Sequence, residues 1–234
     1  MRGGGLPSPA SKKERKYMTK KKNLCWAIVL TLLFLIFTLL ICTVDVQPIG
    51  PEGTKVGFAG LNEKAHTLFG ENMTLYRITD LLGYVAITVA AFFGVVGLCQ
   101  WIRRKNILKV DRNILALGVL FLIVIGLYFF FSKVAVNYRP VILPDETAPE
   151  ASFPSSHTML ALTVFGGALI ILREKVTERV LRVMLTVLAL ILIAVTVIGR
   201  LLSGAHWLTD ILAGILLTAA LLSWFNLGRK EKAK

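Results

Sequence analysis

The chain is poor in cysteine, histidine and acidic residues. Its 234 residues include three cysteines, three histidines and 14 aspartates and glutamates. Cys25, Cys42 and Cys99 lie inside or at the edge of apolar stretches, in a spacing that matches neither a metal-binding frame nor a disulfide scaffold. No set of carboxylates and histidines resembles a two-metal site. We therefore expect no metal, no cofactor and no disulfide.

Long polar segments are also few, and hydrophobic residues make up 55% of the chain. Continuous apolar runs that approach the ~20 residues of a membrane span cannot be strands of a soluble sheet. The fourth run is short, and it can cross the membrane only if residues 155–157 form the first turn of its helix. The sequence predicts an all-α polytopic membrane protein with six transmembrane helices in a bundle, near 24–44, 80–101, 113–132, 156–172, 180–199 and 206–226.

The net charge of +13 follows the predicted spans. Alternate segments, which include both termini and the loops 102–112 and 173–182, carry 21 of the 27 lysines and arginines. The positive-inside rule places these segments, and so both termini, in the cytoplasm. We interpret the charge as a topology signal with anionic-lipid contact, and we expect no nucleic-acid partner.

The domain organisation follows from the same pattern. Residues 1–22 are polar and then rich in lysine, which predicts a disordered basic cytoplasmic tail. Residues 23–228 form one integral membrane domain, and 229–234 a second basic tail. Between the first two spans, the helical spacing of apolar residues over 61–76 predicts an amphipathic helix at the membrane surface.

Two of the three histidines lie at the starts of apolar runs. His206 and Asp210 are four residues apart, so they share one face of the sixth helix. An aspartate there can accept the Nδ1 proton of the imidazole and leave Nε2 free to attack. Arg200, at the end of the fifth helix, has donors that match a phosphate. The alternative is an interfacial histidine, a snorkelling arginine and a capping aspartate.

His157 follows Pro154-Ser155-Ser156, which is typical of a helix start with a serine cap. The free N–H groups of a first helical turn bind anions, and His157 could protonate a leaving group there. Taken alone, an ordinary cap with an incidental histidine is the better interpretation of this segment.

A third basic cluster follows the third span. Lys133 and Arg139 supply positive charge that a phosphoryl transition state needs, although snorkelling would also explain them. The acidic residues of the same loop, including Glu150, are interpreted as solvated. Given the predicted topology, all three clusters emerge on the outer face, and this coincidence favours a phosphoryl-transfer site.

These residues resemble the three motifs of the type 2 phosphatidic acid phosphatase superfamily. The third motif matches from Arg200 through His206 to Asp210, with Gly199 where the family has serine. The second matches at 154–157, except that serine replaces glycine at 156.

The first motif matches at Arg139-Pro140. Five residues separate Lys133 from Arg139 where the family has six, a slip that would rotate a helical lysine by ~100°.

The resemblance implies a metal-independent lipid phosphatase of the cell membrane, with its site on the extracytoplasmic side. It makes His206 the nucleophile, Asp210 its orienting partner and His157 the general acid. It assigns phosphate binding to Arg139, Arg200, Lys133, Ser155 and Ser156.

Undecaprenyl diphosphate is the expected substrate. Phosphatidic acid, diacylglycerol pyrophosphate and phosphatidylglycerophosphate are alternatives. A lipid phosphotransferase and an inactive lipid-binding scaffold are the competing hypotheses.

Overall fold

The computed structural model describes residues 9–143 and 146–229, and seven α-helices occur in these ranges. Six of them are long and apolar enough to cross a membrane. The prediction of an all-α protein with six spans is confirmed. The helices are α1 (Pro9–Thr43), α2 (Ala59–Phe69), α3 (Met73–Arg104), α4 (Arg112–Lys133), α5 (Ser156–Lys175), α6 (Arg179–Leu202) and α7 (Leu208–Gly228), and α2 is the short one.

Polar side chains cap the starts of four spans. The side chains of Asn72, Asp111, Ser155 and Glu178 accept backbone N–H bonds at the starts of α3, α4, α5 and α6. The fourth span does begin at the serine turn, because Ser155 is the cap residue of α5.

The amino-terminal segment differs from the expected disordered tail. Helix α1 begins at Pro9, so residues 9–22 are helical, while residues 1–8 and 230–234 lie outside the described ranges. Lysine, arginine, glutamate and alanine dominate 10–22 and are good helix formers, which extends the apolar helix upstream.

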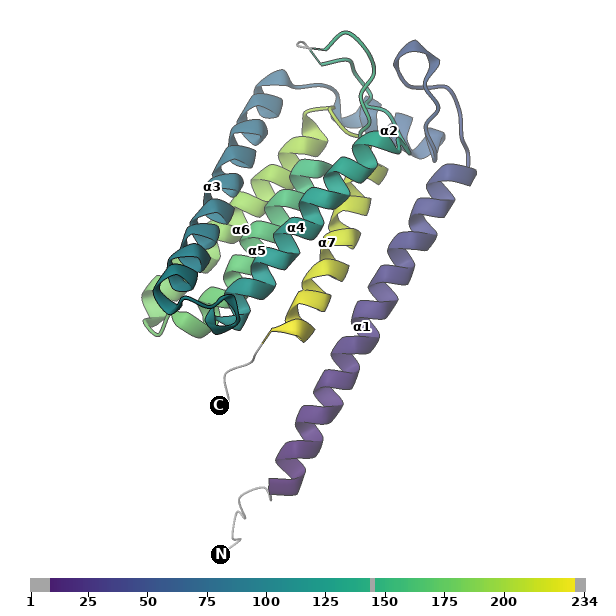
Figure 1. Cartoon of the computed structure of the whole chain (residues 1–234). Coiled ribbons are helices and arrows are strands. Elements are labelled where there is room, and N and C mark those ends of the chain that lie inside the picture. Colours follow the sequence, from purple (N-terminus) through teal and green to yellow (C-terminus); the bar gives the residue numbers. More distant parts are fainter. Residues whose placement is uncertain (1–8, 144–145, 230–234) are drawn as a thin grey trace, which may run out of the picture.

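Helix α5 is the centre of the bundle. Half of its membrane-spanning window is buried, the largest share of any span, and it packs against α3, α4, α6 and α7. Helix α1 packs against α7 at the edge of the bundle (Figure 1). The start of α5 therefore lies where several helices converge.

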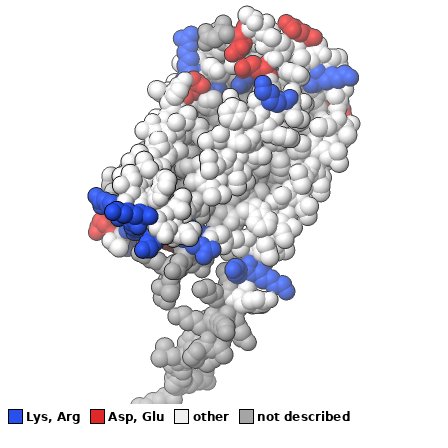
Figure 2. Space-filling view, in the orientation of Figure 1, with Lys and Arg blue, Asp and Glu red and all other residues white. Residues whose placement is uncertain are grey.

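The two ends of the bundle differ in charge. The connections 44–72, 134–155 and 203–207 meet at one end, which we call the site end (Figure 1). The start of α1 and the end of α7 lie at the opposite end. Lysine and arginine gather at that opposite end, acidic and basic residues mix at the site end, and an uncharged band separates them (Figure 2). This band fits a helical bundle in a bilayer.

Helix α2 covers part of the site end. It ends at Phe69, before Gly70 with φ of 68°, so the predicted helix over 61–76 is too long and Tyr76 belongs to α3. Asn62 of α2 is fully buried. Its Nδ2 donates to Thr209 Oγ1 at 2.9 Å, and its Oδ1 accepts from the Thr209 backbone N–H at 3.2 Å. Helix α2 is thereby fixed to the start of α7.

Candidate functional site

A cavity of about 700 Å³ opens at the site end. Its walls come from α3, α4, α5, the loop before α5 and the turn before α7. The polar residues that line it include Asp80, Lys133, Arg139, Ser156, His157 and His206. The cavity continues between apolar side chains such as Ile87, Val124 and Leu160. It can thus receive a polar group joined to an apolar chain.

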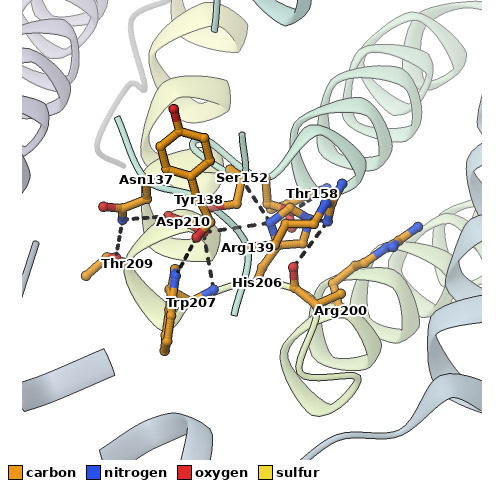
Figure 3. A network of polar contacts seen from close by, with 12 residues as sticks. Asn137, Tyr138, Arg139, Ser152, Thr158, Arg200, His206, Trp207, Thr209 and Asp210 are labelled. Carbon is orange, nitrogen blue, oxygen red and sulfur yellow. Dashed lines mark hydrogen bonds and ion pairs between the residues drawn. The ribbon is translucent and has the colours of Figure 1, made fainter. Parts of the chain in front are cut away.

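His206 lies in the turn between α6 and α7, and its side chain is 1% exposed. Its Nδ1 lies 3.1 Å from the carbonyl oxygen of Ser152, and its Nε2 lies 3.2 Å from Nη1 of Arg139 (Figure 3). A carbonyl only accepts and a guanidinium only donates. These partners assign the proton to Nδ1 and leave a lone pair on Nε2.

The charge of this imidazole is set by its surroundings. Burial lowers the pKa of His206 well below its usual value, and the positive charges of Arg139 and Arg200 lower it further. The ring is therefore neutral at pH 7, the state in which Nε2 is a nucleophile.

Asp210 is fully buried beside His206, but not in the expected contact. Its Oδ2 is 3.8 Å from Nδ1 of His206, too long for a hydrogen bond. Instead Oδ2 accepts from the Trp207 backbone N–H at 3.2 Å, and Oδ1 accepts from Asn137 Nδ2 at 3.0 Å (Figure 3). The Ser152 carbonyl takes the place that we expected Asp210 to fill.

Arg139 is oriented by an acidic residue that the sequence analysis interpreted as solvated. Its Nε donates to Glu150 Oε2 at 2.9 Å, and its Nη1 donates to the Ala205 carbonyl at 3.1 Å. Glu150 and Arg139 also lie on paired backbone segments, since the Arg139 N–H donates to the Glu150 carbonyl. The guanidinium is thus fixed against His206 before any ligand arrives.

Arg200, in the last turn of α6, is 0% exposed. Its Nη2 donates to Asp80 Oδ1 at 3.1 Å, and its guanidinium carbon lies 4.7 Å from the centre of the Tyr76 ring. Nε and Nη1 have no hydrogen-bond partner among the described residues. Buried donors without partners are costly, which makes them candidates for binding an anion.

His157, in the first turn of α5, completes the histidine pair. Its Nε2 lies 3.1 Å from Asp80 Oδ1, at the wall of the cavity. The two serines before it differ. Ser156 lines the cavity, whereas Ser155 is fully buried and its side chain caps α5.

Lys133 is the last residue of α4 and lines the cavity. Of the residues expected from the sequence, Lys133, Arg139, Ser156, His157 and His206 line this cavity, whereas Ser155, Arg200 and Asp210 are buried behind its surface.

Sequence reasoning missed four partners: Asp80, Asn137, Glu150 and the carbonyl of Ser152. Of these, Asp80 had a usable signal, because a carboxylate at the start of a membrane span is a functional candidate by default. The other partners come from an irregular loop whose path the sequence did not reveal.

Comparison with known proteins shows what the chain is similar to. Residues 137–233 match the family model of the PAP2 superfamily. The fold is similar to the crystal structure of the first transmembrane PAP2 type phosphatidylglycerolphosphate phosphatase from Bacillus subtilis, with a TM-score of 0.61 over 86% of this chain and 94% of that one. The two sequences are 16% identical, so this likeness concerns the fold. No curated protein matches the chain. The matched segment holds both site histidines and both site arginines, and over that segment the chain is similar to the type 2 phosphatidic acid phosphatase (PAP2) superfamily.

Proposed function

We propose that the protein is a lipid phosphatase that hydrolyses a lipid phosphate or diphosphate through a phosphohistidine on His206. The observation that carries the proposal is the pair of partners of His206. The Ser152 carbonyl accepts the Nδ1 proton, and Arg139 holds a positive charge 3.2 Å from the free Nε2. A nucleophile beside a fixed cation is the arrangement that phosphoryl transfer requires.

The reaction has two steps. In the first, His206 Nε2 bonds to phosphorus while the bond from phosphorus to the leaving oxygen breaks, and His157, as the imidazolium, gives that oxygen the proton of its Nε2 and becomes neutral. In the second, water bonds to phosphorus, His157 takes a proton from the water, and the bond to Nε2 breaks. Arg139 and Arg200 offset the charge on the phosphate oxygens, with Lys133 and the start of α5 adding further donors.

We propose that the substrate is a diphosphate or monophosphate of a long-chain lipid, with undecaprenyl diphosphate first among the candidates. The apolar extension of the cavity between α3 and α4 supports a lipid, since Tyr84, Ile87 and Tyr128 line it. Phosphatidic acid, diacylglycerol pyrophosphate and phosphatidylglycerophosphate carry the same headgroup chemistry. The assay therefore includes all four lipids.

The decisive experiment measures phosphate release by the purified protein in detergent from each lipid. We expect release that persists in EDTA, is inhibited by vanadate and is lost in His206→Ala. His66→Gln is the matched control, because His66 pairs with Glu71 at 3.4 Å outside the cavity. Loss of activity in EDTA would contradict the metal-independent mechanism, and full activity in His206→Ala would exclude the assigned nucleophile.

The same assay separates the competing functions. Transfer of labelled phosphate to an added lipid alcohol, in place of release to water, would identify a phosphotransferase. Neither release nor transfer from any lipid would favour the scaffold.

We further propose that the site end faces the outside of the cell membrane, because the basic residues gather at the opposite end. Thr147→Cys, in the loop before α5, should react with an impermeant thiol reagent on intact cells. Leu108→Cys, between α3 and α4, should react only after lysis. Both changes are made in a chain whose three natural cysteines are replaced by serine. The reverse pattern would overturn the orientation.

A further inference from the structure

We propose that Asp80 is a positioning residue that holds the proton-donating nitrogen of His157 and the guanidinium of Arg200 in the geometry of the reaction. The inference rests on the proposed function. Oδ1 of Asp80 lies 3.1 Å from Nε2 of His157 and 3.1 Å from Nη2 of Arg200, so one oxygen joins α3, α5 and α6. None of the three motifs contains Asp80.

The position of the proton on His157 follows from this contact. A carboxylate oxygen presents only lone pairs, so the nitrogen that lies 3.1 Å from it, Nε2 of His157, carries a proton. Nδ1 is buried and has no hydrogen-bond partner among the described residues. The two histidines thus differ at Nε2: His206 has a free lone pair there, and His157 has a proton there. Asp80 sets the second of these.

The backbone of α3 is shaped for the contact. A Cβ atom at Gly83 would lie 2.9 Å from Cδ2 and 3.0 Å from Nε2 of His157, so a glycine here makes room for the ring one turn from Asp80. On the other side, a Cβ atom at Gly199 would lie 2.5 Å from Cγ2 of Thr79. Both close approaches flank Asp80, and both bring its partners within reach.

A purely structural ion pair between α3 and α6 is the simpler alternative. It would explain the bond to Arg200, which is completely buried, but not the second partner. The side chain of Asp80 is 37% exposed and lines the cavity together with His157. A carboxylate that shares its oxygen with the general acid, at the cavity wall, is placed to orient proton transfer.

The test compares two phosphate esters that carry alkyl chains of similar length. One is an alkyl phosphate, whose alkoxide leaves only with a proton. The other is a nitrophenyl phosphate, whose leaving group needs none. The quantity compared is kcat/KM, because it reports the first step and not the hydrolysis of the phosphohistidine that both esters share. In Asp80→Asn we expect kcat/KM for the alkyl ester to fall roughly 10- to 100-fold, a part of the ~10²–10⁴ that a general acid contributes. For the nitrophenyl ester we expect a change of less than about threefold.

Effects through Arg200 are common to both esters, because both carry the same phosphate. A difference between the esters therefore reports on His157. Glu71→Gln, which neutralises a carboxylate of the site end outside the cavity, is the matched control and should leave both rates near wild type. Equal losses on the two esters, or no loss, would overturn the proposal.

A second variant covers the case in which Asp80→Asn does not fold. Gly83→Ala keeps the carboxylate and displaces the His157 ring, and it should give the same loss confined to the alkyl ester. If Gly83→Ala slows both esters equally, the proposal is overturned. A wild-type protein that hydrolyses neither ester nor any lipid would instead refute the proposed function.

Discussion

The close approach of α3 and α6 at Gly199 and Thr79 leads to a prediction that tests the packing beneath the site. A Cβ atom added to Gly199 would lie 2.5 Å from Cγ2 of Thr79. Thr79 has little freedom to move, since it is completely buried and its Oγ1 donates to the carbonyl oxygens of Leu75 and Tyr76 at 2.8 and 2.9 Å. Gly199→Ala must therefore push the helices apart.

The magnitude follows from two opposing effects. Overpacking a buried contact costs about 1–3 kcal/mol, while alanine in place of glycine in a helix gains about 1 kcal/mol. Gly199→Ala alone should thus destabilise by about 0–2 kcal/mol. In a Thr79→Ala background the nearest remaining atom is Cβ of residue 79, at 4.0 Å, an ordinary contact. There Gly199→Ala should stabilise by about 1 kcal/mol.

The assay is the thermal unfolding of the wild type, both single variants and the double variant in one detergent. The expected coupling is about 1–3 kcal/mol, and 1 kcal/mol corresponds to roughly 2–4 °C in Tm for a chain of this size. Phosphate release should also fall in Gly199→Ala and recover in the double variant, because the Asp80–Arg200 contact spans the same two helices. Effects on Tm that add to within about 1 °C would refute the reasoning.

Four further predictions concern the site and the stability of the fold. Asp210→Asn should lower the steady-state kcat by roughly 10- to 100-fold, because the Ser152 carbonyl still orients His206. A triad with a direct contact loses ~10⁴-fold in the same kind of variant. A loss of that size here would assign the orienting role to Asp210. The acid limb of kcat/KM should lie below the ordinary histidine pKa of ~6.5, since burial and two arginines lower the pKa of His206, and Arg139→Gln should move that limb to higher pH. The lowered pKa of His206 also affects stability. An unfolded histidine takes up a proton near pH 6.5 and buried His206 does not, so the free energy of unfolding should decrease as the pH falls through ~6.5. Lys133→Ala, at the rim, should raise KM by about fivefold with kcat nearly unchanged, and a collapse of kcat would place Lys133 at the reacting phosphate.

The fold could be predicted because a bilayer leaves few choices. Apolar runs of about 20 residues must satisfy their own backbone hydrogen bonds, so they form helices and their number is read from the sequence. Periodicity was less reliable outside the membrane. It joined α2 to the start of α3 because Gly70, whose φ of 68° ends α2, does not interrupt the apolar spacing around it.

The site could be predicted in part. His157, Arg200 and His206 were assigned from their spacing and their places at span ends, and the structure brings them together. The groups that contact and orient these side chains could not be predicted from residue spacing. The Ser152 carbonyl is a backbone atom with no sequence signature, and Asp80 comes from a span more than 70 residues before its histidine partner.

The three departures from the family motifs, which gave the scaffold hypothesis its support, have structural explanations. Gly199 stands where the family has serine, and the space there is taken by Thr79. Ser156 replaces a glycine, but its backbone does not have the positive φ that would require one. The slip at Lys133 does not rotate the lysine, because α4 ends there and the chain to Arg139 is irregular. Each departure leaves in place the groups that the proposed reaction needs. These are the free Nε2 of His206, the protonated Nε2 of His157 opposite the Asp80 carboxylate, and two arginines. A scaffold has no use for a histidine with a free Nε2 lone pair beside one with a protonated Nε2, so the geometry supports the proposed catalysis.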